Sequence, residues 1–116
     1  MTQARPNLLV IRSADIDRAV TFYQALGLAF VKHAHGTGPE HFACELADFV
    51  FEIYPLDDQM PATTSTRLGF KVNHTDETVD ALRTLGATII CEASDSPWGR
   101  RAVVDDFDGH RVELSS

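Results

Sequence analysis

Two glutamates lie at alternating positions in strand-like stretches of this 116-residue chain. Glu52 and Glu113 each stand between two apolar residues, within residues 49–55 and 110–114. Such alternation is typical of a β-strand, because successive side chains point to opposite faces of the sheet. We therefore expect both glutamates on the face opposite the apolar residues, where a carboxylate is a candidate general base.

The same alternation assigns basic side chains to that face. They are Arg12, Arg67, Lys71 and Arg111, accompanied by Leu8, Val10, Val50 and Tyr54. The predicted face thus has more cations than carboxylates, although the whole chain carries a net charge of -7. Guanidinium groups bind carboxylates and phosphates through two parallel hydrogen bonds. These residues predict a pocket for an anionic or polyoxygenated organic ligand.

A predicted hairpin adds Arg100 and Arg101 to this charge, next to Trp98. We expect Trp98, Phe42 or Tyr54 to form an apolar wall of the pocket. The alternative is a solvated sheet face, on which Arg–Glu pairs across strands contribute only about 0.2–1 kcal/mol each.

Histidines surround a polar loop that contains two glycines. His35 and His41 flank residues 36–40, and His33 precedes His35 by two positions. If the loop folds over the pocket, His35 and His41 are candidates for ligand contact or acid–base chemistry. Together with Glu52, the three histidines are also an alternative set of metal ligands. His74 and His110, at a helix start and in a hairpin, are expected to be structural.

The elements that carry these residues occur twice. A strand over 7–12, a helix that ends at Gly27, and strands over 28–34, 41–46 and 49–55 are followed by a second such series. That series has a strand over 66–72, a helix that ends at Gly86, and strands near 87–92, 101–105 and 110–114. The repeat predicts an α+β fold of two tandem βαβββ modules whose curved sheets surround a cup. We expect one domain over 1–116, with modules at 7–55 and 66–115 and a linker at 56–65.

Composition excludes several classes of protein. The 44% hydrophobic and 23% charged residues are typical of a folded domain, not of a disordered chain. The acidic balance argues against nucleic acid as a partner. The first six residues hold no apolar run typical of a signal peptide, and no stretch approaches the about 18 apolar residues of a membrane span. With only Cys44 and Cys91, both expected as free thiols, we predict a cytoplasmic protein without a membrane partner.

Four segments together resemble a known family. They are Ala14–Tyr23 (ADIDRAVTFY), Leu26–Leu28 (LGL), Pro97–Gly99 (PWG) and Asp106–Leu114 (DFDGHRVEL). With the repeated βαβββ order, they resemble the vicinal oxygen chelate superfamily, which includes glyoxalase I, bleomycin-resistance proteins and extradiol dioxygenases. The resemblance covers nearly the whole chain. It implies a homodimer with pockets where modules meet.

The resemblance also implies four positions for metal ligands. Metal-dependent members carry them in the first, fourth, fifth and last strands, which correspond here to Leu8, Glu52, Arg67 and Glu113. Leucine has no ligand atom and a guanidinium offers no lone pair, so only half of the set is preserved. We therefore expect no cofactor, with a divalent metal ion as the alternative.

These observations leave three functions open. The first is a metal-free protein of the bleomycin-resistance type that binds a small molecule. The second is an enzyme: a glyoxalase-like lyase or isomerase or a dioxygenase with metal, or a metal-free enzyme with Glu52 or Glu113 as base and Arg67 as oxyanion stabiliser. The third is a structural role, as a degenerate module that is kept as an interaction domain.

Overall fold

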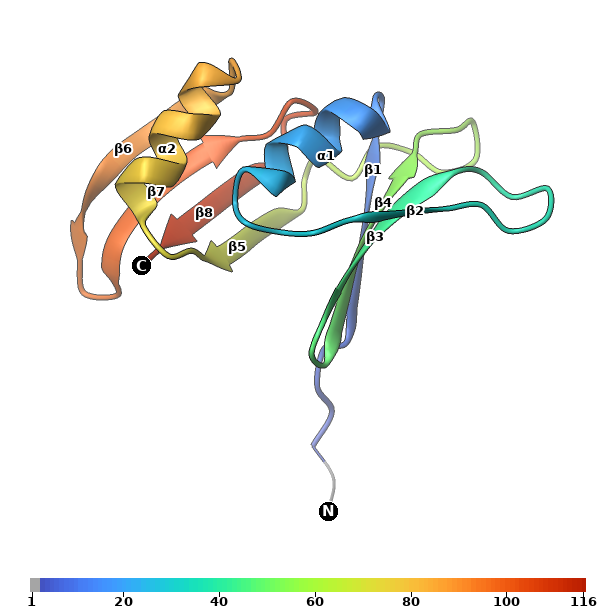
Figure 1. The fold of residues 1–116 in the computed structure, drawn as a ribbon, viewed down its shortest axis with the longest axis horizontal. Coiled ribbons are helices and arrows are strands. Elements are labelled where there is room, and N and C mark those ends of the chain that lie inside the picture. The colour runs from blue at the N-terminus through green and yellow to red at the C-terminus, as the bar shows by residue number, and fades with distance from the viewer. Residues whose placement is uncertain (1–2) are drawn as a thin grey trace.

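Each half of the chain folds into a four-stranded sheet with one helix, in the order that the repeat predicts (Figure 1). The computed structural model describes residues 3–116; Met1 and Thr2, part of the predicted domain, lie outside the described residues. The first half contains β1 (Leu8–Ser13), α1 (Ile16–Gln24), β2 (Val31–His33), β3 (His41–Leu46) and β4 (Phe49–Pro55). The second contains β5 (Arg67–Lys71), α2 (Thr75–Thr84), β6 (Thr88–Ser96), β7 (Gly99–Asp105) and β8 (Arg111–Ser115).

The two sheets have the same topology. Their strand orders are β1-β4-β3-β2 and β5-β8-β7-β6, and in each the first strand runs parallel to the last strand of its half. This equivalence confirms the predicted α+β fold of tandem βαβββ modules. Four strands differ in length from the prediction: β2 and β5 are shorter and β6 and β7 are longer, with the largest differences in β2 and β6. β2 is shorter because only Val31–His33 pair with β3, and β6 is longer because two register shifts let it follow β7 as far as Ser96.

Local signals in the sequence determine where the helices begin and end. The Asp15 side chain accepts a hydrogen bond from the backbone N–H of Arg18 (3.1 Å), which caps the first turn of α1. Gly27 and Gly86 follow the two helices with φ of 98° and 93°, a conformation that glycine adopts without steric cost. Within residues 3–116, neither helix has the length and apolar character needed to cross a bilayer.

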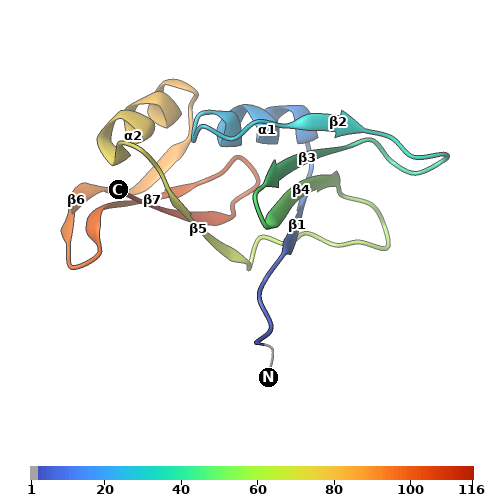
Figure 2. The same cartoon turned by 60° about the horizontal axis from the view of Figure 1, so that its bottom comes forward.

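Both helices cover the same side of the molecule (Figure 2). In Figure 1 the second sheet is seen broadside while the first stands nearly edge-on, so the curved sheets lie side by side and do not close on each other. The α1 side chain Tyr23 joins the halves, because its ring centroid lies 5.0 Å from that of Phe51 in β4 and 5.9 Å from that of Phe70 in β5. One hydrophobic cluster therefore spans both modules.

A buried polar network connects the same parts of the fold. The Tyr23 hydroxyl donates to Asp106 Oδ2 (2.6 Å), and His110 Nδ1 lies 2.8 Å from the same oxygen. Asp106 Oδ1 accepts the backbone N–H groups of residues 108–110 in the turn before β8. His110 Nε2 lies 2.7 Å from the hydroxyl of Thr63, in the segment that links the halves. His110 therefore has a structural role, as the sequence predicts.

Acid is expected to weaken this network. Burial alone would raise the pKa of Asp106, but hydrogen bonds from His110 and Tyr23 outweigh burial and bring that pKa below its usual value. Because the pKa is lower in the folded than in the unfolded chain, the stabilisation is complete well above pH 4. It is lost as pH falls below about 4 through the folded pKa. Urea unfolding at pH 7 and pH 3 measures this loss, and an Asp106→Asn variant should lose less between the two pH values. Equal losses would contradict the assignment to Asp106.

Candidate functional site

Side chains alternate between a helix-covered face and an open face in both sheets. In β4, Phe51 and Ile53 are buried beneath the helices, whereas Glu52 is only half-buried on the other side. In β8, Val112 and Leu114 are buried in the same way and Glu113 is not. The open faces therefore carry the charged residues that the alternation predicts for them.

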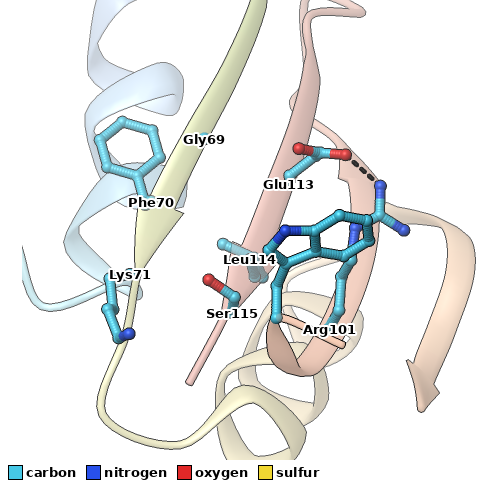
Figure 3. Close-up of a pocket in the computed structure, with 8 residues that line it drawn as sticks. Gly69, Phe70, Lys71, Arg101, Glu113, Leu114 and Ser115 are labelled. Carbon is cyan, nitrogen blue, oxygen red and sulfur yellow. Dashed lines mark hydrogen bonds and ion pairs between the residues drawn. The ribbon is translucent and has the colours of Figure 1, made fainter. Parts of the chain in front are cut away.

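A cavity of about 450 Å³ lies on the open face of the second sheet (Figure 3). Its lining comes from β5, β7, β8 and the β6–β7 turn, and consists of Gly69, Phe70, Lys71, Trp98, Arg101, Glu113, Leu114 and Ser115. The volume lies within the range of about 300–1,000 Å³ that is usual for small-molecule sites. Trp98, the single tryptophan of the sequence, is 76% exposed despite its large apolar ring. Contact between a ligand and such an exposed indole is favourable, because it removes apolar surface from water.

Two arginines hold Glu113 at this cavity. Arg67 Nη2 donates to Glu113 Oε1 (2.8 Å), and Arg101 forms an ion pair with the same oxygen (Figure 3 shows the pair with Arg101). The hydrogen bond from Arg101, followed by that from Arg67, lowers the pKa of Glu113. Glu113 therefore stays ionised and is a weak proton acceptor, which makes it poorly suited to act as a general base.

The charge around the cavity is positive. Arg67 and Arg101 share the single carboxylate of Glu113. Within residues 3–116, no carboxylate lies within ion-pair distance of Lys71, which also lines the cavity. The three cations and the one carboxylate together carry a net charge of +2, in a chain whose net charge is -7. A carboxylate or phosphate group would balance this local excess.

The open face of the first sheet gathers a different set of residues. The buried ring of His41 stacks on Tyr54, with 4.1 Å between centroids and 7° between planes. Its Nε2 lies 3.5 Å from Glu52 Oε2. The guanidinium group of Arg12 lies over the Tyr54 ring, with its central carbon 4.9 Å from the ring centroid. The rings of His33 and His35 lie beside His41.

The remaining predicted residues lie outside these two groups. Arg100 points to the helix side of β7, where Nε binds Asp76 Oδ1 (2.9 Å) at the start of α2. Arg111 is paired with Asp105 (3.1 Å), and Leu8 is 54% exposed at the beginning of β1. Phe42 pairs with Ile53 and packs against the core, so it forms no wall on the open face.

Arg101 matters more than the sequence analysis predicted. Ala102 and Val104 of β7 are fully buried beneath the helix, so the alternate residues Arg101 and Val103 point to the open face. The alternation along residues 99–105 was the available signal, and it separates Arg101 from its neighbour Arg100. The contact of Tyr23 with Asp106 had no such signal, because 83 positions separate the two residues.

Side-chain chemistry tests whether the four family positions fit a metal ion. Leu8 has no donor atom, Arg67 has no lone pair, and the carboxylate of Glu113 is bound by two guanidinium groups. Only Glu52 remains as a ligand, so these residues do not fit a divalent ion. Asp106, Asp108 and His110 also lie close together, but both Asp106 oxygens already accept hydrogen bonds within the buried network.

Comparison with known proteins agrees with the fold. Residues 5–114 match the model of the glyoxalase/bleomycin resistance protein/dioxygenase superfamily. No curated protein matches the chain. Among solved structures, TnmS3, an antibiotic-binding protein from Streptomyces sp. CB03234, superposes with a TM-score of 0.76 and 23% identity, covering 99% of this chain and 97% of its own. A glyoxalase-related enzyme from Fulvimarina pelagi gives a TM-score of 0.75 and 21% identity, covering 97% of this chain and 87% of its own.

At these identities the structural neighbours establish the fold alone. The family match is broader evidence, since it extends over nearly every strand and both helices. With its two βαβββ modules, the chain belongs to the glyoxalase/bleomycin resistance protein/dioxygenase superfamily.

Proposed function

We propose that the chain binds a small organic anion with an apolar body, in the cavity on the second sheet, without a metal ion at the four family positions. The observation that carries this proposal is the pairing of Glu113 with both Arg67 and Arg101 next to Lys71. The pairing engages the only carboxylate of the cavity and leaves an excess of positive charge. An anionic ligand balances that excess through charge-assisted hydrogen bonds.

Apolar groups in the same cavity support a ligand with an aromatic or aliphatic part. Trp98 is largely exposed at the edge of the cavity and offers the apolar surface; Phe70 and Leu114 also line it, but their side chains pack toward the helix-covered core. A site with a few charged groups among apolar walls is the usual form of a small-molecule pocket. The similarity to TnmS3, an antibiotic-binding protein, is consistent with a role in binding a small molecule.

A homodimer is part of this proposal. The two sheets lie side by side, so the open face of each is left uncovered by the other half of the chain (Figures 1 and 2). Exposed apolar side chains, among them Leu8 and Trp98, lie at these faces. A second copy would cover them and enclose the ligand between modules.

The alternative function is a lyase, isomerase or dioxygenase of the same superfamily. It requires either a metal at the family positions or a carboxylate that accepts a proton. Leu8 and Arg67 offer no metal ligand, and the lowered pKa of Glu113 makes it a weak proton acceptor. Glu52, the other candidate base, lies on the first sheet and does not line the cavity. Binding without turnover is therefore the function that these residues support best.

Removal of metal ions is expected to leave ligand binding unchanged. The probe is 2-naphthoate, a fused aromatic ring that carries one carboxylate, and isothermal titration calorimetry measures its affinity. Protein dialysed against EDTA should bind it as tightly as untreated protein, because lysine and arginine supply the anion contacts. A loss of affinity that added Zn²⁺ or Ni²⁺ restores would show that a metal holds the ligand, and it would favour the enzyme.

A further inference from the structure

Three imidazole rings meet on the open face of the first sheet, away from the cavity on the second. His33 of β2 and His41 of β3 are direct partners across the antiparallel pair. His35 follows His33 by two residues, at the start of the loop that connects the strands. Each pair among the three rings has centroids 5.7 Å apart.

The hydrogen bonds of His41 determine which of its nitrogens is free. Nδ1 lies 3.3 Å from the carbonyl oxygen of Pro39, which can only accept a hydrogen bond. Nδ1 therefore carries the proton, and Nε2 is the nitrogen that faces Glu52 Oε2 at 3.5 Å. In the neutral ring, Nε2 presents a lone pair to a carboxylate, and two such acceptors repel unless a cation lies between them.

The separation of these two atoms suits a metal ion. Two donors bound to one tetrahedral Zn²⁺ at about 2.0–2.2 Å stand roughly 3.4 Å apart. The His41 side chain is 5% exposed and that of Glu52 is 20% exposed, so little water competes for the position between them. The carbonyl of Pro39 accepts a hydrogen bond from the other ring nitrogen of His41, and such a bond fixes the tautomer of a metal-binding histidine.

We propose that His41 and Glu52, together with His33 and His35, bind a divalent transition-metal ion such as Zn²⁺ or Ni²⁺. Imidazole nitrogen with one carboxylate favours these ions over Ca²⁺ and Mg²⁺, which prefer oxygen. Of the described residues, only Asp106, Asp108 and His110 have ligand atoms already gathered around one point, so the site closes by rotation of the more exposed His33 and His35.

This site differs from the metal position of the family. Three of its four ligands belong to the β2–β3 hairpin, and only Glu52 occupies a family position. The proposal does not depend on the cavity of the second sheet, since its ligand is the metal ion alone. Its failure would leave the proposed binding of an organic anion untouched.

Calorimetric titration of ZnCl₂ into the untagged, EDTA-treated full chain tests the site. We expect saturation at one ion per chain and, with CoCl₂, the visible absorption of tetrahedral Co²⁺. An H33A/H35A double variant should bind Zn²⁺ at least about tenfold more weakly, as should Glu52→Gln, which keeps the side-chain volume. MgCl₂ in excess should not compete.

His74→Ala is the matched control, because His74 precedes α2 in the other half and its side chain caps no helix N–H. This variant should bind Zn²⁺ like the original chain. The proposal is overturned if no saturable binding occurs up to about 1 mM Zn²⁺, which would mean that only a proton lies between His41 and Glu52. It is equally overturned if the double variant and Glu52→Gln both keep the original affinity.

Discussion

Replacement of Asp106 by alanine is expected to lower the free energy of unfolding by about 3–5 kcal/mol, the usual cost when one member of a buried charged network is removed. For a domain of this size, that corresponds to a melting temperature lower by roughly 12–20 °C. Chemical unfolding in urea and thermal unfolding followed by circular dichroism both measure the change.

The size of this effect follows from the number of groups that Asp106 satisfies. One oxygen accepts three backbone N–H groups of the β7–β8 turn, and the other accepts the Tyr23 hydroxyl and lies 2.8 Å from His110 Nδ1. Alanine would leave the buried Tyr23 hydroxyl, His110 Nδ1 and the His110 backbone N–H without this partner, and each unsatisfied buried group costs about 1–3 kcal/mol before the structure relaxes. The change would also remove the hydrogen bond that joins Tyr23 of α1 to the second half of the chain.

Asp108→Ala is the control for this prediction. Asp108 lies in the same turn, but its side chain makes an exposed hydrogen bond to the backbone N–H of Ala14 (2.8 Å). Its replacement should cost about 1 kcal/mol. Similar losses for the two variants would contradict a special role of the buried network.

Much of this fold is predictable from local patterns. The glycines that end the helices, the Asp-Gly turn before β8 and the alternation along β4 and β8 all act within a few residues. These patterns also repeat, which predicts two equivalent modules. The way that the two sheets sit side by side was not predictable, because it depends on Tyr23 and Phe70, which lie far apart in the sequence and meet only in the core.

The candidate site was predictable only in part. Alternation assigns Lys71 and Glu113 to the open face, and applied to β7 it also separates Arg101 from Arg100. It does not determine that Arg67 and Arg101 both reach the same carboxylate, which depends on side-chain conformation. The contact between His33 and His41 depends on the register of β2 and β3. The irregular loop between these strands does not fix that register, so it could not be predicted from the sequence.

The second large effect concerns the cations at the cavity. Replacement of Lys71 or Arg101 by glutamine is expected to weaken the binding of 2-naphthoate about 10–100-fold, since hydrogen bonds to charged groups contribute about 1.5–3 kcal/mol. Glutamine keeps a polar side chain of similar reach and removes the charge. The uncharged analogue 2-naphthamide should bind the variants and the original chain alike.

Arg100→Gln is the control for these variants. Arg100 adjoins Arg101 in β7, but its guanidinium binds Asp76 and Asp95 on the opposite side of the strand. This variant removes the same charge from the chain and should keep the original affinity for 2-naphthoate. An equal loss in Arg100→Gln and Arg101→Gln would mean that overall charge, and not the cavity, attracts the anion.

The most direct test of a cationic binding cavity is the ratio of two affinities in the unmodified protein. Calorimetric titration with 2-naphthoate and with 2-naphthamide compares ligands of the same shape that differ in charge. We predict that the carboxylate binds at least about tenfold more tightly, a difference of about 1.4 kcal/mol or more. Equal affinities, or tighter binding of the amide, would contradict the account.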